Sequence, residues 1–291
     1  MSPSDADIHH VSDTALMVAA CRALETDRPD GLVRDPFARQ LAGERGMAIA
    51  QGLAQTRGDG RGLDMMRFGV GVRSRFMDEL VLDVTTRRNV AAVLSLGAGL
   101  DSRPWRLDLP EHVRWIEVDF PAMLDYKAAI MVRHQPKCRM ERLSADLNDA
   151  SQRSAVFAAA GSAPALMITE GLLMYLPADT IDALAVEPPR MSGIQYWLTD
   201  LISTDLRGLA QMDCQSIDNV RAAGHLNGEQ ILEIALRNGW TSAEWRNYVM
   251  DAWQAAPERV QELARSASAS GKTLSPPPPG DPSGVRLFAR Q

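Results

Sequence analysis

The chain has 291 residues, of which 45% are hydrophobic and 23% charged, with a formal net charge of −6 and a pI near 5.4. This length can bury a large core, as one large α/β domain or as two small ones. The acidic balance argues against nucleic acid or an anionic membrane surface as a partner, because both attract basic proteins. No apolar run approaches the length that spans a bilayer.

The cysteines and the N-terminus indicate the compartment. Cys21, Cys138 and Cys214 have no metal-ligand spacing, and an odd number of scattered thiols fits a reducing environment. The first residues lack a positive stretch followed by an apolar one, so we expect no signal peptide. The sequence predicts a cytoplasmic protein with a small-molecule partner, and it leaves the oligomeric state open.

The first ninety residues are expected to be largely helical. Helical spacing of apolar residues marks three segments: 12–24, a shorter one opening at Asp35-Pro36, and 63–84. Residues 46–62 contain five glycines, which predicts a mobile loop at the margin of a lid. We therefore expect residues 1–62 to form a helical cap, whose first ten residues are a loose polar tail.

From about residue 90 onward, apolar runs alternate with helical segments, which is the pattern of a doubly wound α/β fold. Strands are predicted at 91–96, 113–118, 138–143, 165–169, 195–201, 240–249 and 285–289. Helices are predicted at 121–133, 150–160, after Pro177, at 226–238 and at 254–264. Four consecutive prolines make 272–284 an expected surface connection. We expect a single domain whose core spans 63–291, with an excursion at 250–284 before the last strand.

A glycine turn follows the first predicted strand. Gly97-Ala98-Gly99 lets the chain turn sharply and lets a ligand approach the backbone, and a helical turn after it would point N–H groups at an anion. Ser102 stands where a dinucleotide-binding fingerprint has Gly or Ala, which disfavours a pyrophosphate. The turn therefore predicts a site for a smaller anionic group, such as the carboxylate of S-adenosylmethionine.

Four acids follow successive predicted strands: Asp119, Asp146, Glu170 and Asp200. Ligands of parallel sheets bind at the carboxyl ends of the strands, so we expect these side chains at one edge. Buried carboxylates need partners, which predicts a cation or a ligand rich in donors. No His or Cys stands beside them, which disfavours a transition metal, whereas Mg²⁺ held by the acids alone stays an alternative.

Three of the candidate residues have two interpretations each. Asp119 is predicted to accept hydrogen bonds from the hydroxyls of a ribose, or to cap the helix that begins near residue 121. Asp146, with Leu147 beside it, is predicted to bind adenine, or to cap the helix near residue 150. Arg73 is expected either to reach a ligand carboxylate or to lie on a solvated helix face.

Glu170 and His225 are the candidates for a catalytic role. Glu170 ends an apolar strand before a glycine, where a ligand can approach closely, and a salt bridge to an arginine is its alternative role. His225 is the histidine considered as a general base, with an exposed loop histidine as the alternative.

Several segments in a fixed order carry a resemblance to a known family. They are 14–20 with 22–25 and 34–38, then 73–78, 96–107, 117–121 with Lys127, 145–147 and 169–176. Together they resemble the leucine carboxyl methyltransferase family, and particularly its bacterial branch of tetracenomycin-type polyketide O-methyltransferases. The segment 96–107 is the most specific. Beyond residues 187–189 the chain departs from the family pattern, which leaves the acceptor pocket undefined.

The resemblance implies S-adenosylmethionine as methyl donor and an oxygen, often of a carboxylate, as acceptor. It implies a Rossmann-like class I methyltransferase sheet, mostly parallel with an antiparallel last strand, under an N-terminal helical cap. The family pattern assigns Arg73 and Gly97 to the methionine end, Asp119 to the ribose, Asp146 with Leu147 to adenine, and Glu170 to the methionyl portion near the reacting methyl. Gly99, in the glycine turn, is a further candidate for binding the cofactor.

We therefore expect an O-methyltransferase that uses S-adenosylmethionine and acts on a small metabolite, in one interpretation a polyketide. A carboxylate acceptor, with a pKa of about 4, is ionised at neutral pH and needs no base, whereas a phenol, with a pKa of about 10, needs one. Two other classes stay open: a protein that binds S-adenosylmethionine without turnover, and a nicotinamide-dependent oxidoreductase, against which Ser102 and the position of Asp146 argue.

Overall fold

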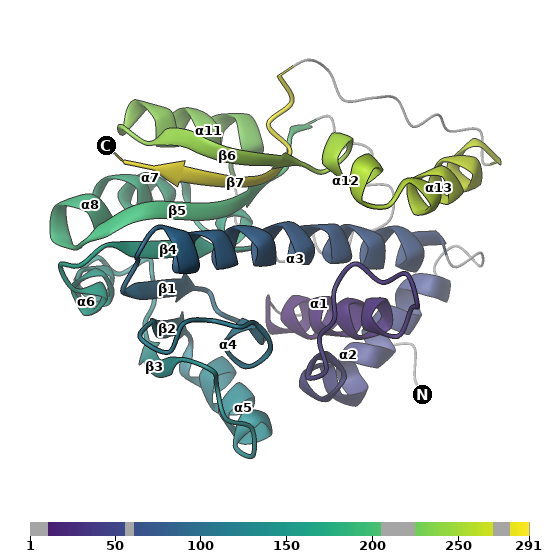
Figure 1. Cartoon of the computed structure of the whole chain (residues 1–291), viewed down its shortest axis with the longest axis horizontal. Coiled ribbons are helices and arrows are strands. Elements are labelled where there is room, and N and C mark those ends of the chain that lie inside the picture. Colours follow the sequence, from purple (N-terminus) through teal and green to yellow (C-terminus); the bar gives the residue numbers. More distant parts are fainter. Residues whose placement is uncertain (1–10, 56–60, 205–224, 270–279, 291) are drawn as a thin grey trace.

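Seven strands form one sheet in the order β3-β2-β1-β4-β5-β7-β6 in this computed structural model, which describes residues 11–55, 61–204, 225–269 and 280–290 (Figure 1). The strands are β1 (Ala92–Leu96), β2 (Arg114–Asp119), β3 (Arg139–Ser144), β4 (Ala165–Thr169), β5 (Ile194–Leu201), β6 (Thr241–Asn247) and β7 (Gly284–Ala289). Paired strands from β3 to β5 are parallel, and β7 is antiparallel to both β5 and β6. The carboxyl ends of β1 to β6 therefore share one edge. The predicted Rossmann-like sheet with an antiparallel last strand is confirmed.

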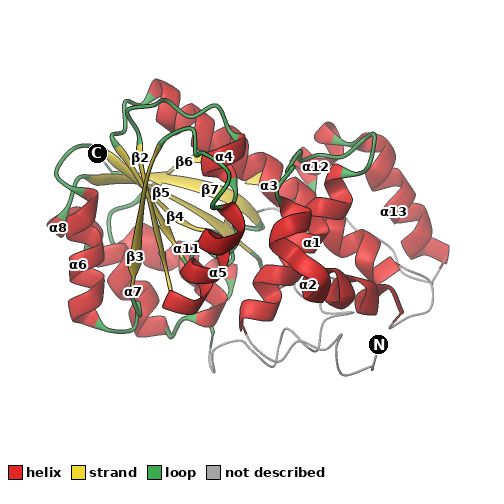
Figure 2. Cartoon of the chain, turned by 90° about the horizontal axis from the view of Figure 1, so that it is seen from below, coloured by secondary structure: helices red, strands yellow, loops and turns green. Residues whose placement is uncertain are grey.

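Helices cover both faces of this sheet and its carboxyl edge. They are α1 (Val11–Thr26), α2 (Ala38–Gln55), α3 (Arg61–Arg87), α4 (Arg103–Arg106), α5 (Pro121–Met131), α6 (Ala150–Ala160), the 3₁₀ helix η2 (Leu173–Tyr175), α7 (Ala178–Val186), α8 (Pro188–Met191), α11 (Gly228–Arg237), α12 (Met250–Ala255) and α13 (Pro257–Ala269). The helices α1, α2, α12 and α13 lie together beyond the carboxyl ends of the strands (Figure 2). Within the described residues, no helix combines the length and the apolar character that crossing a membrane requires.

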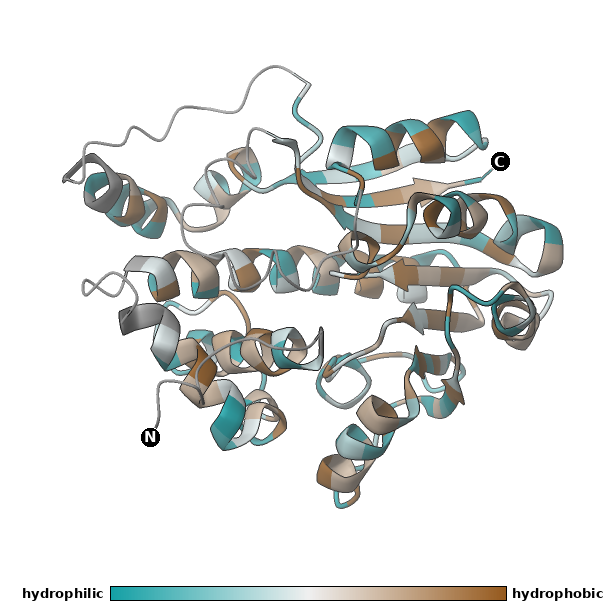
Figure 3. Ribbon diagram, turned by 180° about the vertical axis from the view of Figure 1, so that it is seen from behind, coloured by the Kyte–Doolittle hydropathy of each residue, from teal (hydrophilic) through white to brown (hydrophobic). Residues whose placement is uncertain are grey.

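The central strands β1 and β4 are buried over their whole length, because helices cover both faces of the sheet. On one face, Leu94 and Met167 pack into a core with α6, α7 and α11. On the other face, Val93 and Leu166 pack against α3. Figure 3 shows these hydrophobic strands between helices of mixed character. The apolar runs of the sequence are thus the interior of a doubly wound layer structure.

The expected glycine-rich loop over residues 46–62 is wrong, because residues 46–55 continue α2 and residues 61–62 begin α3. Gly46 serves packing instead. A Cβ at Gly46 would lie 2.6 Å from the carbonyl oxygen of Leu16, so the missing side chain lets α2 approach α1. Residues 56–60, which hold two of the five glycines, lie outside the described residues.

The other expected elements match in type and within a few residues, with one further difference. The helix predicted over residues 254–264 is two helices, α12 and α13, separated at Ala256, whose φ of −150° and ψ of 64° are not helical. Pro257 then begins α13, a position that suits proline because its missing N–H is not needed there. The polar tail at 1–10 and most of the connection at 272–284 lie outside the described residues.

A fully buried ion pair joins β2 to α5. Lys127 and Glu117 are both 0% exposed, and the Lys127 ammonium donates to Oε1 of Glu117. The second carboxylate oxygen of Glu117 accepts a hydrogen bond from Arg142 Nε at 3.1 Å. The ammonium also lies 5.6 Å from the centre of the Trp105 ring. These contacts hold α5 on the strand that ends in Asp119.

Candidate functional site

The turn after β1 is built from two left-handed glycines. Gly97 has φ of 59° and Gly99 has φ of 42°, a region that side-chain-bearing residues rarely adopt. Space is also restricted at Gly97, where a Cβ would lie 2.7 Å from Cδ1 of Leu172. The backbone N–H of Gly99 donates to Oδ2 of Asp119 at 2.7 Å. The structure therefore joins the predicted glycine turn to the predicted acid of the second strand.

Asp119 holds the turn in place with both carboxylate oxygens. Besides Gly99, it accepts a hydrogen bond from the N–H of Phe120 at 2.7 Å. Burial raises the pKa of this carboxyl, while these two backbone donors oppose the rise. The alternative of a helix cap is not what is seen, since α5 begins after Phe120 without a side-chain cap. Asp119 therefore presents a carboxylate at the strand edge, between β1 and β2.

Asp146 and Leu147 follow β3 in the loop before α6. Oδ1 of Asp146 accepts the N–H of Asn148 at 2.9 Å. The cap of α6 is Asp149, which accepts from the N–H groups of Ser151 and Gln152, so Asp146 does not take the capping role. Leu147 is buried in the core cluster that includes α6. The pair thus lies at the same edge as Asp119, one strand farther out.

Glu170 and Asp200, at the ends of β4 and β5, are both paired with Arg73. Nε of Arg73 lies 2.9 Å from Oε1 of Glu170, and its Nη1 lies 3.2 Å from Oδ2 of Asp200. Oδ1 of Asp200 also accepts the N–H of Gly171 at 2.6 Å. Arg73 is therefore turned into the site, contrary to a solvated helix face. The salt-bridge alternative for Glu170 is what the structure shows.

Arg103 extends this pairing, and sequence reasoning assigned it no role. It lies 2.6 Å from Oε2 of Glu170, 2.7 Å from Asp78 and 3.0 Å from Asp101, with 3% of its side chain exposed. Burial disfavours the charged form of Glu170, but the charges of Arg103 and Arg73 outweigh burial and lower its pKa. Glu170 is consequently ionised at neutral pH, which makes it a poor acceptor of protons.

The ion pairs form one connected network. Arg106 binds Asp78 through two nitrogens, and its third nitrogen donates to Oγ of Ser102 at 3.2 Å. The Ser102 hydroxyl donates to Asp35 at 2.7 Å, and Asp35 pairs with Arg22 at 2.9 Å. The network comprises Arg22, Arg73, Arg103 and Arg106 with Asp35, Asp78, Asp101, Glu170 and Asp200. Counted over the described residues, it thus has one more carboxylate than guanidinium groups.

This network explains why Ser102 replaces the Gly or Ala of a dinucleotide fingerprint, since its hydroxyl joins Arg106 to Asp35. Arg73, Glu170 and Asp200 were candidates in the sequence, whereas the other members of the network lie in segments that resemble the family and had no role of their own. Their roles depend on pairs as distant as Ser102 and Asp35, which are 67 residues apart.

The Asp101 carboxyl makes the free energy of unfolding depend on pH. Burial raises the pKa of this carboxyl, but the charges of Arg103, Lys127 and Arg106 and the N–H of Arg103 together outweigh burial and lower the pKa to about 2. A carboxyl with a lowered folded-state pKa stabilises the fold above its unfolded pKa of about 4, and this contribution is lost as the pH falls through the folded-state value. The shift corresponds to about 2 kcal/mol at neutral pH.

Asp101→Asn should therefore weaken the loss of stability in acid. We expect the free energy of unfolding, measured with urea between pH 5 and pH 2.5, to fall by up to about 2 kcal/mol less in the variant than in the wild type. Asp125→Asn, at an exposed position of α5, is the matched control and should keep the wild-type slope. Equal slopes for Asp101→Asn and the wild type would contradict this assignment.

α1 covers the Gly97–Gly99 turn. The hydroxyl of Tyr175 donates to Oγ1 of Thr14 at 3.2 Å, and Nη2 of Arg22 donates to the carbonyl of Leu100 at 2.6 Å. A Cβ at Gly99 would lie 3.7 Å from Cβ of Ala15. α1 therefore contacts the loop after β1 and the segment after β4 at once.

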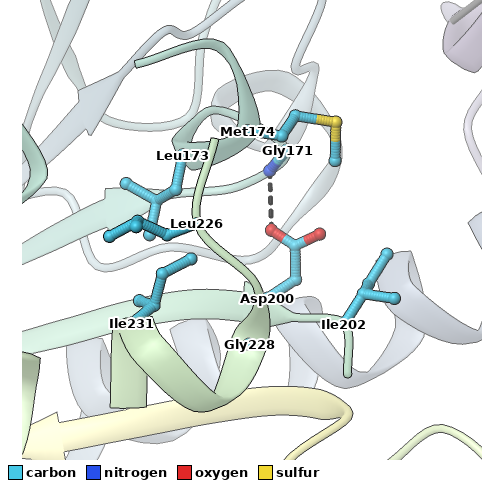
Figure 4. A pocket seen from close by; sticks show the side chains of 8 residues that line it. All are labelled: Gly171, Leu173, Met174, Asp200, Ile202, Leu226, Gly228 and Ile231. Atoms are coloured by element: carbon cyan, nitrogen blue, oxygen red, sulfur yellow. Dashed lines mark hydrogen bonds between the residues drawn. The ribbon is translucent and has the colours of Figure 1, made fainter. Parts of the chain in front are cut away.

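A pocket opens beside Asp200, at the carboxyl ends of β4 and β5 (Figure 4). Its lining is mostly apolar: Gly171, Leu173, Met174, Asp200, Ile202, Leu226, Gly228 and Ile231. In Figure 4 the Asp200 carboxylate points toward the N–H of Gly171, while the side chains of Leu173, Leu226 and Ile231 point toward one another. His225 is half-buried and immediately precedes Leu226, so the backbone brings it to the margin of this pocket.

Among the described residues, no group of three His, Cys, Asp or Glu side chains is arranged to hold a metal ion. Arg73 and Arg103 supply the positive charge beside Glu170 and Asp200 that the Mg²⁺ alternative assigned to a metal ion.

Comparison with known proteins agrees with this geometry. Residues 15–187 match the family described as leucine carboxyl methyltransferase. A protein of Streptomyces avermitilis, provisionally named an S-adenosyl-L-methionine-dependent methyltransferase, is 37% identical over 175 residues, which cover 59% of this chain and 62% of that protein. A protein of Mycobacteroides abscessus with the same provisional name is 38% identical over 185 residues, covering 60% and 59%. The matches thus span about 60% of the length of these relatives.

Among solved structures, a DUF574 family protein from Streptomyces avermitilis is similar over the full length of both chains, with a TM-score of 0.57 and 12% sequence identity. At this identity the likeness concerns the fold. The family match is more specific, because it includes the glycine turn, Asp119, Asp146 and Glu170, and it ends at residue 187, where the sequence pattern was expected to depart. The chain belongs to the leucine carboxyl methyltransferase family.

Proposed function

We propose that this protein transfers the methyl group of S-adenosylmethionine to a carboxylate oxygen of a small metabolite. The observation that carries the proposal is the left-handed Gly97–Gly99 turn, whose backbone binds Asp119 at the end of the neighbouring strand. Membership of the family and the provisional names of the two relatives support the methyl transfer and its donor.

The residues at the strand edge fit S-adenosylmethionine. We assign Asp119 to the ribose hydroxyls, since each carboxylate oxygen uses one acceptor site for a backbone N–H and has a second. Gly97 lets the ligand pass close to the backbone, and Asp146 with Leu147 receives the adenine. The ion-pair network has one more carboxylate than guanidinium groups, which favours a ligand that carries a positive sulfonium.

Arg73 and Glu170 form the charged group at the methionine end. We assign Arg73 to a ligand carboxylate, as a charge-assisted partner. Glu170 lies against Nε of Arg73 and Asp200 lies against its Nη1, so the guanidinium is oriented from two sides, and Arg103 in turn holds Glu170. Because the pKa of Glu170 is lowered, its proposed part in catalysis is electrostatic and does not include proton transfer.

The reaction requires little acid–base chemistry from the chain. The bound donor supplies a methyl group already activated by its sulfonium, and the protein has to hold the acceptor oxygen in line with it. Leucine and isoleucine side chains beside Asp200 offer an apolar contact to part of an acceptor, and a polyketide acid is one acceptor of this kind. The cap of residues 1–62, to which α1 belongs, would exclude water from this assembly.

The direct test uses S-adenosylmethionine labelled in the methyl group. Purified protein, incubated with the labelled donor and a fraction of small organic acids, should release a product whose label is removed by mild alkaline hydrolysis, as a methyl ester is. Calorimetry with S-adenosylhomocysteine and with NAD accompanies it. Binding of S-adenosylhomocysteine without any labelled product would favour a binding protein without turnover, and binding of NAD instead would overturn the proposal.

His225 separates the two acceptor classes once a methylated product is identified. For a carboxylate acceptor, which is ionised at neutral pH with a pKa of about 4, we expect kcat/KM of His225→Ala to stay within about twofold of the wild type. For a phenol, loss of a general base should cost roughly 10²–10⁴-fold. His112→Ala, at an exposed position before β2, is the control. A loss on the second scale would reject the carboxylate.

A further inference from the structure

Tyr248 is the first residue after β6, in the part of the chain beyond the family match. Because β5 and β6 are both antiparallel to β7, they point the same way and end at the same edge. Across β7, Asp200 of β5 faces Val285, and Val285 faces Arg246 of β6. The chain therefore leaves β6 level with Asp200, at the same edge of the sheet and with β7 between the two strands.

The backbone around Tyr248 is held firmly. Asn247 is buried, and its side chain donates to the carbonyl of Ser283 at 3.1 Å while accepting from the N–H groups of Val249 and Met250 at 2.8 Å each. The N–H of Asn247 donates to Asp251 at 2.6 Å. A side chain on a backbone fixed from both sides is pre-organised, which is what a binding group requires.

The hydroxyl of Tyr248 is buried and has no hydrogen-bond partner among the described residues. Buried tyrosine hydroxyls usually find a partner, so a hydroxyl without one costs stability and calls for an explanation. The ring packs against the core on the α3 side of the sheet. Burial raises the pKa of Tyr248 well above its usual range, and the charge of Asp200 adds to this rise, so the group is a neutral donor at neutral pH.

A second buried nitrogen at this place has an ion-pair partner but no aligned hydrogen bond. Nε of Arg73 is 2.9 Å from Glu170, close enough for an ion pair, yet the contact lacks the alignment of a hydrogen bond. Tyr248 lies within electrostatic reach of Arg73, Asp200 and Glu170. A hydroxyl donor without a partner, near a guanidinium, matches a negatively charged group with acceptor oxygens, which is a carboxylate.

We propose that the Tyr248 hydroxyl is a positioning group that donates a hydrogen bond to a ligand carboxylate bound by Arg73. This inference rests on the proposed function, in which two carboxylates are available: that of the amino-acid end of the cofactor and that of the acceptor. Tyr248 lies after β6, on the side of the sheet away from Asp119 and Asp146. It therefore contacts the ligand at the end opposite to adenine.

The test compares Tyr248→Phe with the wild type by calorimetry, using S-adenosylhomocysteine and 5′-methylthioadenosine, which lacks the amino acid. If the cofactor supplies the carboxylate, the variant should bind S-adenosylhomocysteine at least about tenfold more weakly and 5′-methylthioadenosine equally well. If the acceptor supplies the carboxylate, the affinities for both nucleosides stay unchanged in the variant. Benzoate should then bind more weakly to the complex of the variant with S-adenosylhomocysteine. Benzamide is the uncharged comparison for benzoate.

Two further measurements keep the outcomes distinct. Tyr196→Phe, a tyrosine in the first half of β5, is the matched control and should leave every affinity unchanged. The melting temperature of Tyr248→Phe should equal or exceed that of the wild type, because the change removes a buried hydroxyl without a partner; a clear decrease would indicate a structural role. Unchanged binding in both the cofactor and the benzoate arms would overturn the inference. A wild type that binds neither nucleoside would instead overturn the proposed function.

Discussion

Asp119→Ala is expected to weaken binding of S-adenosylhomocysteine by at least about 100-fold, because hydrogen bonds to a charged group contribute about 1.5–3 kcal/mol each and the proposed role includes two of them. The variant also removes the acceptor for the N–H of Gly99, which holds the turn in its left-handed conformation. Both effects act on the same ligand, so the loss should appear as a raised Kd in calorimetry.

Asp119→Asn is the informative companion. An amide oxygen can still accept the N–H of Gly99, but the amide lacks the charge and has one fewer acceptor oxygen for the ribose. We expect an intermediate affinity for this variant, with circular dichroism and melting temperature close to those of the wild type. Wild-type affinity for S-adenosylhomocysteine in Asp119→Ala would remove the ribose assignment and leave Asp119 as a support of the turn.

Lys127→Met is expected to destabilise the fold by roughly 3–5 kcal/mol, since it leaves the carboxylate of Glu117 buried without its main counter-charge. Methionine has a similar shape, so the loss reports the uncompensated charge more than a cavity. The measurement is the free energy of unfolding in urea at neutral pH.

Two controls identify the cause. Arg142→Met removes the other partner of Glu117, but the Arg142 side chain is 34% exposed, so we expect a cost below about 1 kcal/mol. The double variant Glu117→Gln with Lys127→Met should recover much of the loss, because replacing both members of a buried pair is far less costly than replacing one. A cost for Lys127→Met no larger than that for Arg142→Met would show that the burial of the pair is unimportant.

The alternation of strands and helices could be predicted from the sequence, because each central strand is a short apolar run with polar residues, glycine or proline on either side. The expected bounds of 165–169 and 150–160 coincide with β4 and α6. Local patterns suffice there, since both faces of the strand and one face of the helix are buried by elements of the same layer structure.

The glycine content of residues 46–62 was misleading because glycine also occurs where two helices pack closely, as Gly46 does here. Gly46 is required by contact with Leu16, 30 positions earlier, and a composition count cannot distinguish a helix that packs closely from a loop. Its neighbours Ala48, Ile49 and Ala50 are buried, as expected for a packed helix and not for an exposed loop.

The acids at the strand ends were predicted, whereas their partners were not. Arg103 joins Glu170, Asp78 and Asp101 from three elements, and pairs separated by 67 or 25 residues leave no periodic signal. Tyr248 could not be identified either, because its significance comes from a hydroxyl without a partner, which is a property of the folded chain. The assignments of ligands to Arg73, Gly97, Gly99, Asp119, Asp146, Leu147, Glu170 and His225 stay predictions, and the variants above test those of Asp119 and His225.

The place of β7 between β5 and β6 has a consequence for how the chain is made. β7 is the last strand in chain order, so β6 has no neighbour to pair with until β7 has been synthesised. The neighbourhoods of Gly97, Asp119 and Asp146 belong to β1, β2 and β3, which leave the ribosome early and pair with one another. Asp200 and Tyr248 come together only afterwards. A growing chain would thus complete the strand ends around Gly97, Asp119 and Asp146 first and those around Asp200 and Tyr248 last, because non-local pairing of this kind forms slowly.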